Sequence, residues 1–290
     1  MQAKHVLLML FAVALWGFNF PATRMVLEVF SPLQLAFARA LMTLLVLLPL
    51  WRPFEPVTWR LMAAALAIGG FSFFLVYEAI SLTESLTTVA VGTQLMPPMS
   101  AILSLLLFRE HLSFRKWLGI AIATAGAVYL AGATKSSLSV TALGLTVLAV
   151  SFYSVGSIVI GKSTAVGVWR MLAWIAAISL LPLGLMTAAA GPLFPDLRQL
   201  QFHHWLALVF SVLVAALFGQ AVLFTLYRTY PVSAVISWAL LIPVFAAISS
   251  IVLYHESIPP SLVAGGSVIL AGVWIQQHSA SKRGRDTHVP

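Results

Sequence analysis

Long apolar runs separated by short polar joints fill nearly the whole chain. A helix needs about 20 mostly apolar residues to cross the hydrocarbon core of a bilayer. The joints between the runs carry turn signals such as Ser31-Pro32 and Pro259-Pro260. We count ten predicted spans, at residues 5–27, 32–51, 59–82, 85–108, 113–132, 141–161, 166–190, 204–228, 232–254 and 259–277. The pattern therefore predicts an all-α integral membrane protein with ten transmembrane helices.

One stretch of this pattern occurs twice. Pro97 and Pro243 are 146 residues apart (243 − 97). The same spacing separates three further pairs, Glu110 and Glu256, Gly119 and Gly265, and Gly126 and Gly272. Small residues recur in unrelated membrane helices, but apolar bias supplies neither proline nor glutamate, so we interpret the spacing as an internal duplication. It predicts a first five-helix repeat over residues 1–135, a second over 136–278, and a disordered cytoplasmic tail over 279–290.

Composition narrows the class of protein. The chain is 61% hydrophobic and 8% charged, with a mean hydropathy of +1.00, whereas a soluble domain carries roughly 25% charged residues. There is no cysteine, which excludes disulfides, thiolate metal sites and cysteine nucleophiles. The sequence has no Gly-rich phosphate loop and no nucleophile–base pair. The His203-His204 pair has no partner carboxylate at a metal-ligand spacing. We therefore expect neither an enzyme nor a cofactor or metal ion.

The distribution of positive charge predicts the orientation in the membrane. The formal net charge of +8 would suggest a nucleic-acid partner in a soluble protein. In membrane proteins Lys and Arg instead gather on the cytoplasmic side. With the N-terminus inside, the cytoplasmic side has Lys4, Arg52, Arg60, Arg109, Arg115, Lys116, Lys162, Arg170, Arg228, Lys282, Arg283 and Arg285, and the outer side has Arg24, Lys135 and Arg198. Both termini are thus predicted to be cytoplasmic, and no nucleic-acid partner is expected.

The number of spans in each repeat predicts the kind of function. Because five is odd, the second repeat enters the membrane upside down relative to the first. Glu110 then falls on the cytoplasmic side and Glu256 on the outer side. Inverted repeats are a transporter architecture, with the substrate site near the midplane where the halves meet. The pattern predicts a secondary transporter that works by alternating access.

Each half resembles the five-helix unit of the drug/metabolite transporter superfamily, specifically the EamA-type exporters. That unit has a proline in its fourth helix, a glutamate at the end of that helix and a glycine-bearing fifth helix, which the repeated residues above match. The segment Trp16–Phe20 resembles the family's first helix, and Ala36–Arg39 resembles its second, which carries an arginine. The second half departs from the pattern because the corresponding region of its second helix has Ala173 and Trp174 and no obvious arginine. The resemblance covers residues 5–277 and implies metabolite export across a bacterial inner membrane, closest to the YddG-like exporters of aromatic amino acids.

Polar and aromatic residues inside the spans are the candidates for a substrate cavity. Aromatic rings with a few amide and hydroxyl groups suit a ligand with an apolar body and a polar end. The alternative for each residue is packing in the protein interior or contact with lipid. The predicted cavity residues are Trp16, Asn19, Phe74, Tyr77, Glu78, Gln94, Tyr153, Gln220, Phe224 and Trp238. In the third span we expect Gly70, Phe74, Tyr77 and Ser81 to share one face.

Other residues are assigned gating or structural roles. Pro97 and Pro243 free backbone carbonyls one turn earlier and are candidate hinges, although kinks without such a role are common. Arg39, Glu110 and Glu256 are expected to support the structure, the two glutamates by capping the helices that follow. Small-residue faces in the fifth and tenth spans predict close packing or a homodimer face.

The sequence thus predicts a carrier of small amphipathic metabolites, with amino acids, including aromatic ones, as its substrates and the lipid bilayer as its surroundings. A channel-like facilitator and a carrier of drugs or other metabolites remain the alternatives.

Overall fold

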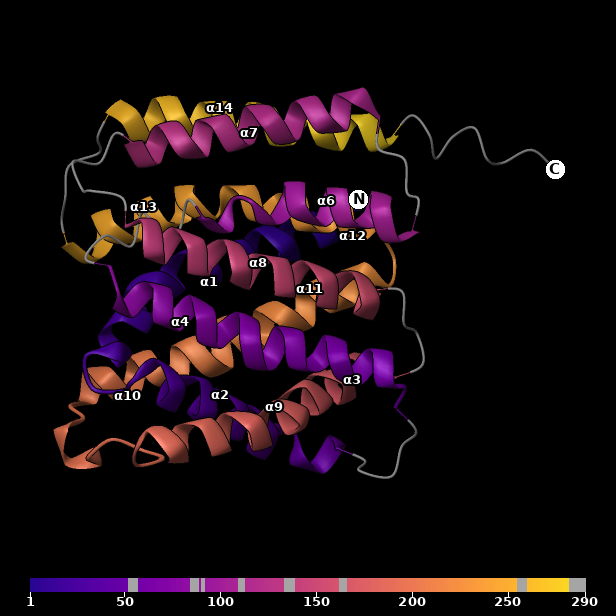
Figure 1. Ribbon diagram of the computed structural model, residues 1–290. Coiled ribbons are helices and arrows are strands. Elements are labelled where there is room, and N and C mark those ends of the chain that lie inside the picture. Colours follow the sequence, from indigo (N-terminus) through magenta and orange to yellow (C-terminus); the bar gives the residue numbers. More distant parts are fainter. Residues whose placement is uncertain are drawn as a thin grey trace.

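The computed structural model of the chain is a bundle of helices that run nearly parallel to one another (Figure 1). The residues described are 1–51, 57–83, 89, 92–108, 113–132, 139–161, 166–254 and 260–281. Six helical segments in this part are long and apolar enough to cross a membrane, and three shorter apolar helices add to them. Predicted Glu110 and Glu256, and most of the predicted tail, lie outside the described residues.

The first, second, sixth and seventh spans are the helices α1 (Ala3–Leu27), α2 (Pro32–Leu47), α8 (Val140–Gly161) and α9 (Val168–Ala190). Helix α2 begins where the sequence places a start signal. The Ser31 hydroxyl accepts a hydrogen bond from the Gln34 amide at 3.3 Å, and the Gln34 side chain accepts one from the Ser31 amide at 2.9 Å. Pro32 follows at the first helical position, where a missing N–H costs nothing.

The third and eighth spans each contain a π-helical segment. The third consists of α3 (Trp59–Leu66), η2 (Ala67–Ser72) and α4 (Phe73–Ser81), and the eighth of α10 (Phe202–Val209), η4 (Phe210–Phe218) and α11 (Gly219–Tyr227). Segments η2 and η4 are π-helical. They lie at matching positions of the two repeats, because Gly69 and Ala215 are 146 residues apart (215 − 69). Such segments widen the helix, change its side-chain phase and are frequent at functional sites.

The fourth and ninth spans are interrupted just before their prolines. The described part of the fourth has a turn at residues 94–95 followed by α6 (Met96–Phe108). The ninth consists of α12 (Val232–Ile236), a 3₁₀ segment η5 (Ser237–Leu241) and α13 (Ile242–Tyr254). Pro97 and Pro243 are the second residues of α6 and α13, where proline fits a helix without losing a hydrogen bond. Each proline, at which we predicted freed backbone carbonyls, thus stands at the start of a new helix.

The fifth and tenth spans, α7 (Phe114–Gly132) and α14 (Pro260–Ser281), lie side by side along one edge of the molecule (Figure 1). Their contact depends on two repeated glycines. A Cβ atom on Gly272 would lie 2.5 Å from the backbone nitrogen of Ala123, and one on Gly126 would lie 2.9 Å from Val268. The small residues predicted for these spans therefore pack the two halves against each other.

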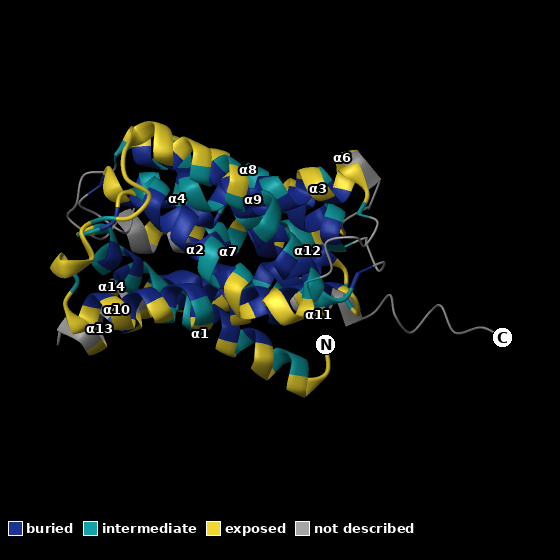
Figure 2. Ribbon diagram, turned by 90° about the horizontal axis from the view of Figure 1, so that it is seen from below, coloured by how far each residue is buried: buried dark blue, intermediate teal, exposed yellow. Residues whose placement is uncertain are grey.

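The two halves repeat the same set of packings, and the repeats are inverted. Helix α1 packs on the eighth and ninth spans, and its counterpart α8 packs on the third and fourth. Helix α2 pairs with α9, as α7 pairs with α14. Figure 1 shows α1 starting at the end of the bundle opposite to that at which α8 starts, and α14 ending at the end at which α1 starts. The buried core runs through both halves (Figure 2).

Candidate functional site

A cavity of about 120 Å³ lies between the two halves. This is about ten times the roughly 10–15 Å³ that a single water molecule needs. Sixteen of the described residues line it, contributed by the first, third, fourth, sixth, eighth and ninth spans. These are the spans that the inverted packing brings together at the centre of the bundle. Its described lining is mostly apolar and aromatic and includes no acidic or basic side chain.

Five of the ten predicted cavity residues line this cavity: Trp16, Asn19, Tyr77, Tyr153 and Gln220. They come from four spans in both halves, so the fold gathers residues that are up to 204 positions apart (220 − 16). Tyr77 and Gln220 are buried, with 2% and 3% of their surfaces exposed. The Tyr153 hydroxyl lies next to the side chains of Gln220 and Ser157.

The other five predicted residues lie elsewhere. Phe74 and Glu78 line a second, separate cavity of about 580 Å³ between α2, α4, α8 and the end of α9. Phe224 is buried against Tyr227, with ring centroids 5.9 Å apart. Gln94 is buried next to the lining residue Thr93, and Trp238 packs at the margin of the main core. Gln94, Phe224 and Trp238 are not among the residues that line the central cavity.

Phe74 and Glu78 were predicted to line the central cavity because the sequence analysis chose the wrong face of the third span. Tyr77 belongs to two helical stripes, one with Phe74 and Ser81 and one with Phe73 and Ile80. We predicted that the stripe with Phe74 faces the cavity, but in the structure the stripe with Phe73 does. Phe73, Val76 and Ile80 on α4 are thus lining residues that the sequence analysis missed. Their i, i+3, i+4, i+7 spacing was the signal available for finding them.

The residues before the two repeated prolines, Pro97 and Pro243, also face the cavity. Met96 and Ile242 are lining residues, and they are equivalent positions of the two repeats, 146 residues apart (242 − 96). Each is the first residue of its helix, α6 or α13. The two helix starts therefore meet the cavity from opposite halves, which places both prolines one residue from its wall.

Trp16 is held in place by the π-helical segment of the opposite half. Its indole Nε1 donates a hydrogen bond to the carbonyl oxygen of Ala215, at 3.1 Å. The ring lies directly over Gly219, where a Cβ atom would approach Nε1 to 2.5 Å. A side chain at position 219 would displace the indole, so the glycine allows the ring to form part of the wall.

Two amide side chains give the cavity its polar character. The Asn19 Oδ1 atom and the Gln220 Nε2 atom are buried and have no hydrogen-bond partner within the described residues. An unpartnered buried polar atom costs about 1–3 kcal/mol unless something bonds to it. One acceptor and one donor are thus available where the two halves meet, in a wall of rings.

Arg39 lies immediately behind this wall. Only 3% of its surface is exposed, and its Nη2 donates a hydrogen bond to the carbonyl oxygen of Gly69 in η2, at 2.7 Å. The guanidinium carbon lies 3.6 Å from the centre of the Phe73 ring, which is a cation–π contact. These contacts hold the guanidinium between η2 and the Phe73 ring.

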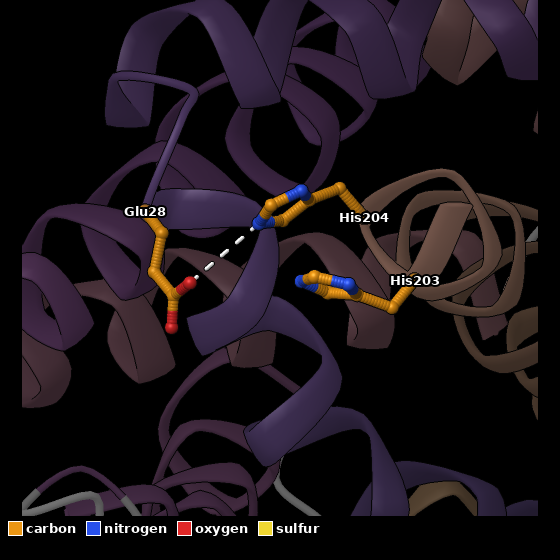
Figure 3. Close-up of side chains that lie close together, drawn as sticks. All are labelled: Glu28, His203 and His204. Atoms are coloured by element: carbon orange, nitrogen blue, oxygen red, sulfur yellow. Dashed lines mark ion pairs between the residues drawn. The ribbon is translucent and has the colours of Figure 1, made fainter. Parts of the chain in front are cut away.

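A second polar cluster lies away from the cavity, where α1 ends and α10 begins (Figure 3). Glu28, His203 and His204 place one ligand atom each within 4.8 Å of one another. No carboxylate stands at a metal-ligand spacing from the histidine pair in the sequence, but the fold brings a distant one close, with Glu28 3.5 Å from Nε2 of His204.

The hydrogen bonds of His204 argue against a metal site in this cluster. Its Nδ1 accepts a hydrogen bond from the Gln201 amide at 3.1 Å. The neutral ring must then carry its proton on Nε2, which points to Glu28, and has no lone pair there for a metal ion. The cluster ties the start of α10 to the end of α1.

Comparison with known proteins agrees with this architecture. The model of the EamA-like transporter family matches the chain twice, over residues 3–132 and 140–276. A probable amino-acid metabolite efflux pump of Salmonella typhimurium is 27% identical over 95% of both chains, and one from Escherichia coli is 26% identical over 95% of both. An uncharacterized transporter of Archaeoglobus fulgidus is 23% identical over 94% of this chain and 98% of its own.

A solved crystal structure shares the fold, with a TM-score of 0.75 and 18% identity over 98% of this chain and 99% of that one. The repeated helices, their inverted packing and the two family matches lead to one conclusion: this chain belongs to the EamA-like transporter family and is a multi-pass membrane transporter rather than an enzyme.

Proposed function

We propose that the chain is a secondary carrier that exports small amphipathic metabolites, and that its substrates are amino acids, including aromatic ones. The observation that carries the proposal is the central cavity, in which an unpartnered acceptor and an unpartnered donor sit among aromatic rings. The two relatives named as probable amino-acid metabolite efflux pumps support the same class of substrate.

The two amides suit the two ends of a zwitterion. The Asn19 Oδ1 atom can accept a hydrogen bond from a substrate ammonium group, and the Gln220 Nε2 atom can donate one to a carboxylate. Both atoms would then gain the partner that they lack. An uncharged lining also suits a carrier, because a fixed ion pair would hold the load too tightly to release it.

The rings around the amides provide an apolar contact surface. Trp16, Phe73, Tyr77 and Tyr153 line the same cavity. Burying an apolar substrate side chain against them contributes about 25 cal/mol for each Å² removed from water. This contribution favours amino acids with apolar or aromatic side chains over small polar ones.

Alternating access is the mechanism that we propose for export. The inverted repeats give one chain two related halves, and exchange of their conformations would open the cavity to one side and then to the other. The helix starts at Pro97 and Pro243 border the cavity in both halves and are the proposed hinges. We place the carrier in a bacterial inner membrane with both termini in the cytoplasm, and it needs no cofactor.

Counterflow in proteoliposomes tests the proposal. Vesicles containing the purified protein are loaded with unlabelled L-phenylalanine, L-methionine or L-serine, and uptake of the same labelled amino acid is followed. We expect transient, saturable accumulation that is largest for L-phenylalanine or L-methionine. Saturable counterflow with a drug-like cation only would favour the multidrug alternative. Flux that neither saturates nor shows trans-stimulation would identify a channel-like facilitator.

A further inference from the structure

Arg39 is a buried charge without a counter-ion in the described part of the chain. Its side chain has one hydrogen bond, to the Gly69 carbonyl, and one ring contact, to Phe73. No described carboxylate lies within 4.0 Å of it, and its Nε has no hydrogen-bond partner there. A carbonyl and a ring compensate only part of a positive charge, and ionisable groups inside a membrane are expensive.

The charge of Arg39 acts on the cavity through its wall. Phe73 contacts the guanidinium and also lines the cavity. Since the sixteen described lining residues include no acid, nothing on the wall itself cancels this field.

We infer that Arg39 is a specificity-determining residue: its positive field makes the cavity selective for substrates with a free carboxylate. The substrate supplies the counter-ion that no described residue gives to Arg39. The contact is indirect, since the Phe73 ring stands between Arg39 and the cavity, so the residue positions charge rather than binding the substrate.

The expected size of the selectivity follows from distance. The guanidinium carbon is 3.6 Å from the ring centre, and a substrate packed on the other face would add about 4 Å. Across a separation of about 8 Å at an effective dielectric constant near 20, the attraction corresponds to about tenfold or more in affinity. A neutral group in place of the carboxylate would forgo this factor, whatever the rest of the substrate.

The inference rests on the proposed amino acid transport, and the test compares substrates before it compares variants. The best transported of L-phenylalanine, L-methionine and L-serine is measured against its own carboxamide, which keeps the ammonium group and side chain. In the wild-type protein we expect a half-saturation concentration about tenfold or more lower for the amino acid. Equal values for the two compounds in the wild-type protein would overturn the inference without touching the proposed function.

The variants assign the selectivity to Arg39. Arg39→Met removes the charge and should bring the ratio of the two half-saturation concentrations close to one, whereas Arg39→Lys should keep most of it. Arg228→Met is the matched control, because Arg228 also donates to a backbone carbonyl, that of Val166, but is exposed and does not line the cavity.

A purely structural role gives a different result. If Arg39→Met slows transport of both compounds equally and leaves their ratio unchanged, Arg39 only supports the fold and the inference is wrong. Should Arg39→Met not insert, the wild-type and Arg39→Lys ratios still decide. If the wild-type protein transports none of the three amino acids, the proposed function fails and the inference fails with it.

Discussion

Asn19 and Gln220 reach the central cavity from opposite halves of the chain, and each brings a buried amide atom without a described partner. Neither residue is charged, so neither carries the full cost of an ion in the membrane. Their arrangement still costs free energy as long as the two atoms are unsatisfied. Such a cost is expected in a site where the substrate completes the hydrogen bonds.

Replacing these amides tests their role. Gln220→Met and Asn19→Leu keep side-chain volume but remove the donor or acceptor. Each should raise the half-saturation concentration for the transported amino acid by about tenfold to a hundredfold, which corresponds to the loss of one hydrogen bond to a charged group. Counterflow in proteoliposomes measures this effect. Gln199→Met is the control, because Gln199 is an exposed glutamine in the 3₁₀ turn η3 (Leu197–Gln199) before α10. Parental kinetics in both cavity variants would move the polar end of the site elsewhere.

Sequence alone located the cavity at the level of spans better than at the level of residues. Aromatic and amide positions within apolar runs were visible, and Trp16, Asn19 and Gln220 were found in that way. The side of the third span that faces the cavity could not be identified in this way, because Tyr77 fits a stripe with Phe74 as well as one with Phe73. Only the packing of α4 against α2 and α8 decides between them.

At the scale of the element, the paired π-helical segments are the feature that no sequence pattern indicated. Both lie in uniformly apolar runs that a hydropathy profile interprets as regular α-helices. Each leaves a carbonyl oxygen that accepts a side-chain donor, Gly69 from Arg39 and Ala215 from Trp16. The two acceptors occupy the same repeat position, so one local distortion supports the wall of the cavity twice.

The contact between α7 and α14 can be tested with two glycines of the same helix. Gly272→Ala places a methyl group 2.5 Å from backbone of α7, which cannot move aside as a side chain can. We expect a loss of about 1–3 kcal/mol in stability. Gly266→Ala is the matched control, because its new methyl group would meet nothing closer than 3.8 Å. Thermal unfolding in detergent, followed by intrinsic tryptophan fluorescence, compares the two. A similar midpoint for both variants would show that α7 and α14 can move apart to accept the new methyl group without a loss of stability.

The helix starts at the two prolines yield a kinetic prediction. In Pro97→Ala and Pro243→Ala the preceding turn can join the helix, which stiffens the junction beside Met96 or Ile242. Turnover should then fall severalfold, whereas the affinity for substrate, measured by equilibrium binding, changes little. Unchanged turnover in both variants would leave the prolines as packing features only.

At the scale of the whole molecule, the spacing of the repeats was enough to predict an inverted pair of five-helix units. The odd number of spans in each half forces the inversion. The first span packs on the eighth and the sixth span packs on the third, as the resulting symmetry requires. The spacing of the repeats does not predict which helix ends contact each other. Glu28 and His204 are 176 residues apart (204 − 28), and only the contact of α1 with α10 brings them together.

The orientation of the bundle is the last prediction. The start of α1 and the end of α14 lie at one end of the bundle, and the start of α10, which holds His203, lies at the other (Figure 1). Because the predicted cytoplasmic side holds most of the basic residues of the sequence, we expect the end with the start of α1 in the cytoplasm. Residues 203 and 2 are exposed, and the chain has no cysteine of its own, so single cysteines can report on each side. His203→Cys should react with an impermeant maleimide in intact cells, and Gln2→Cys only in inside-out vesicles. The opposite labelling pattern would reverse the orientation, and labelling of both positions from the same side would contradict the bundle itself.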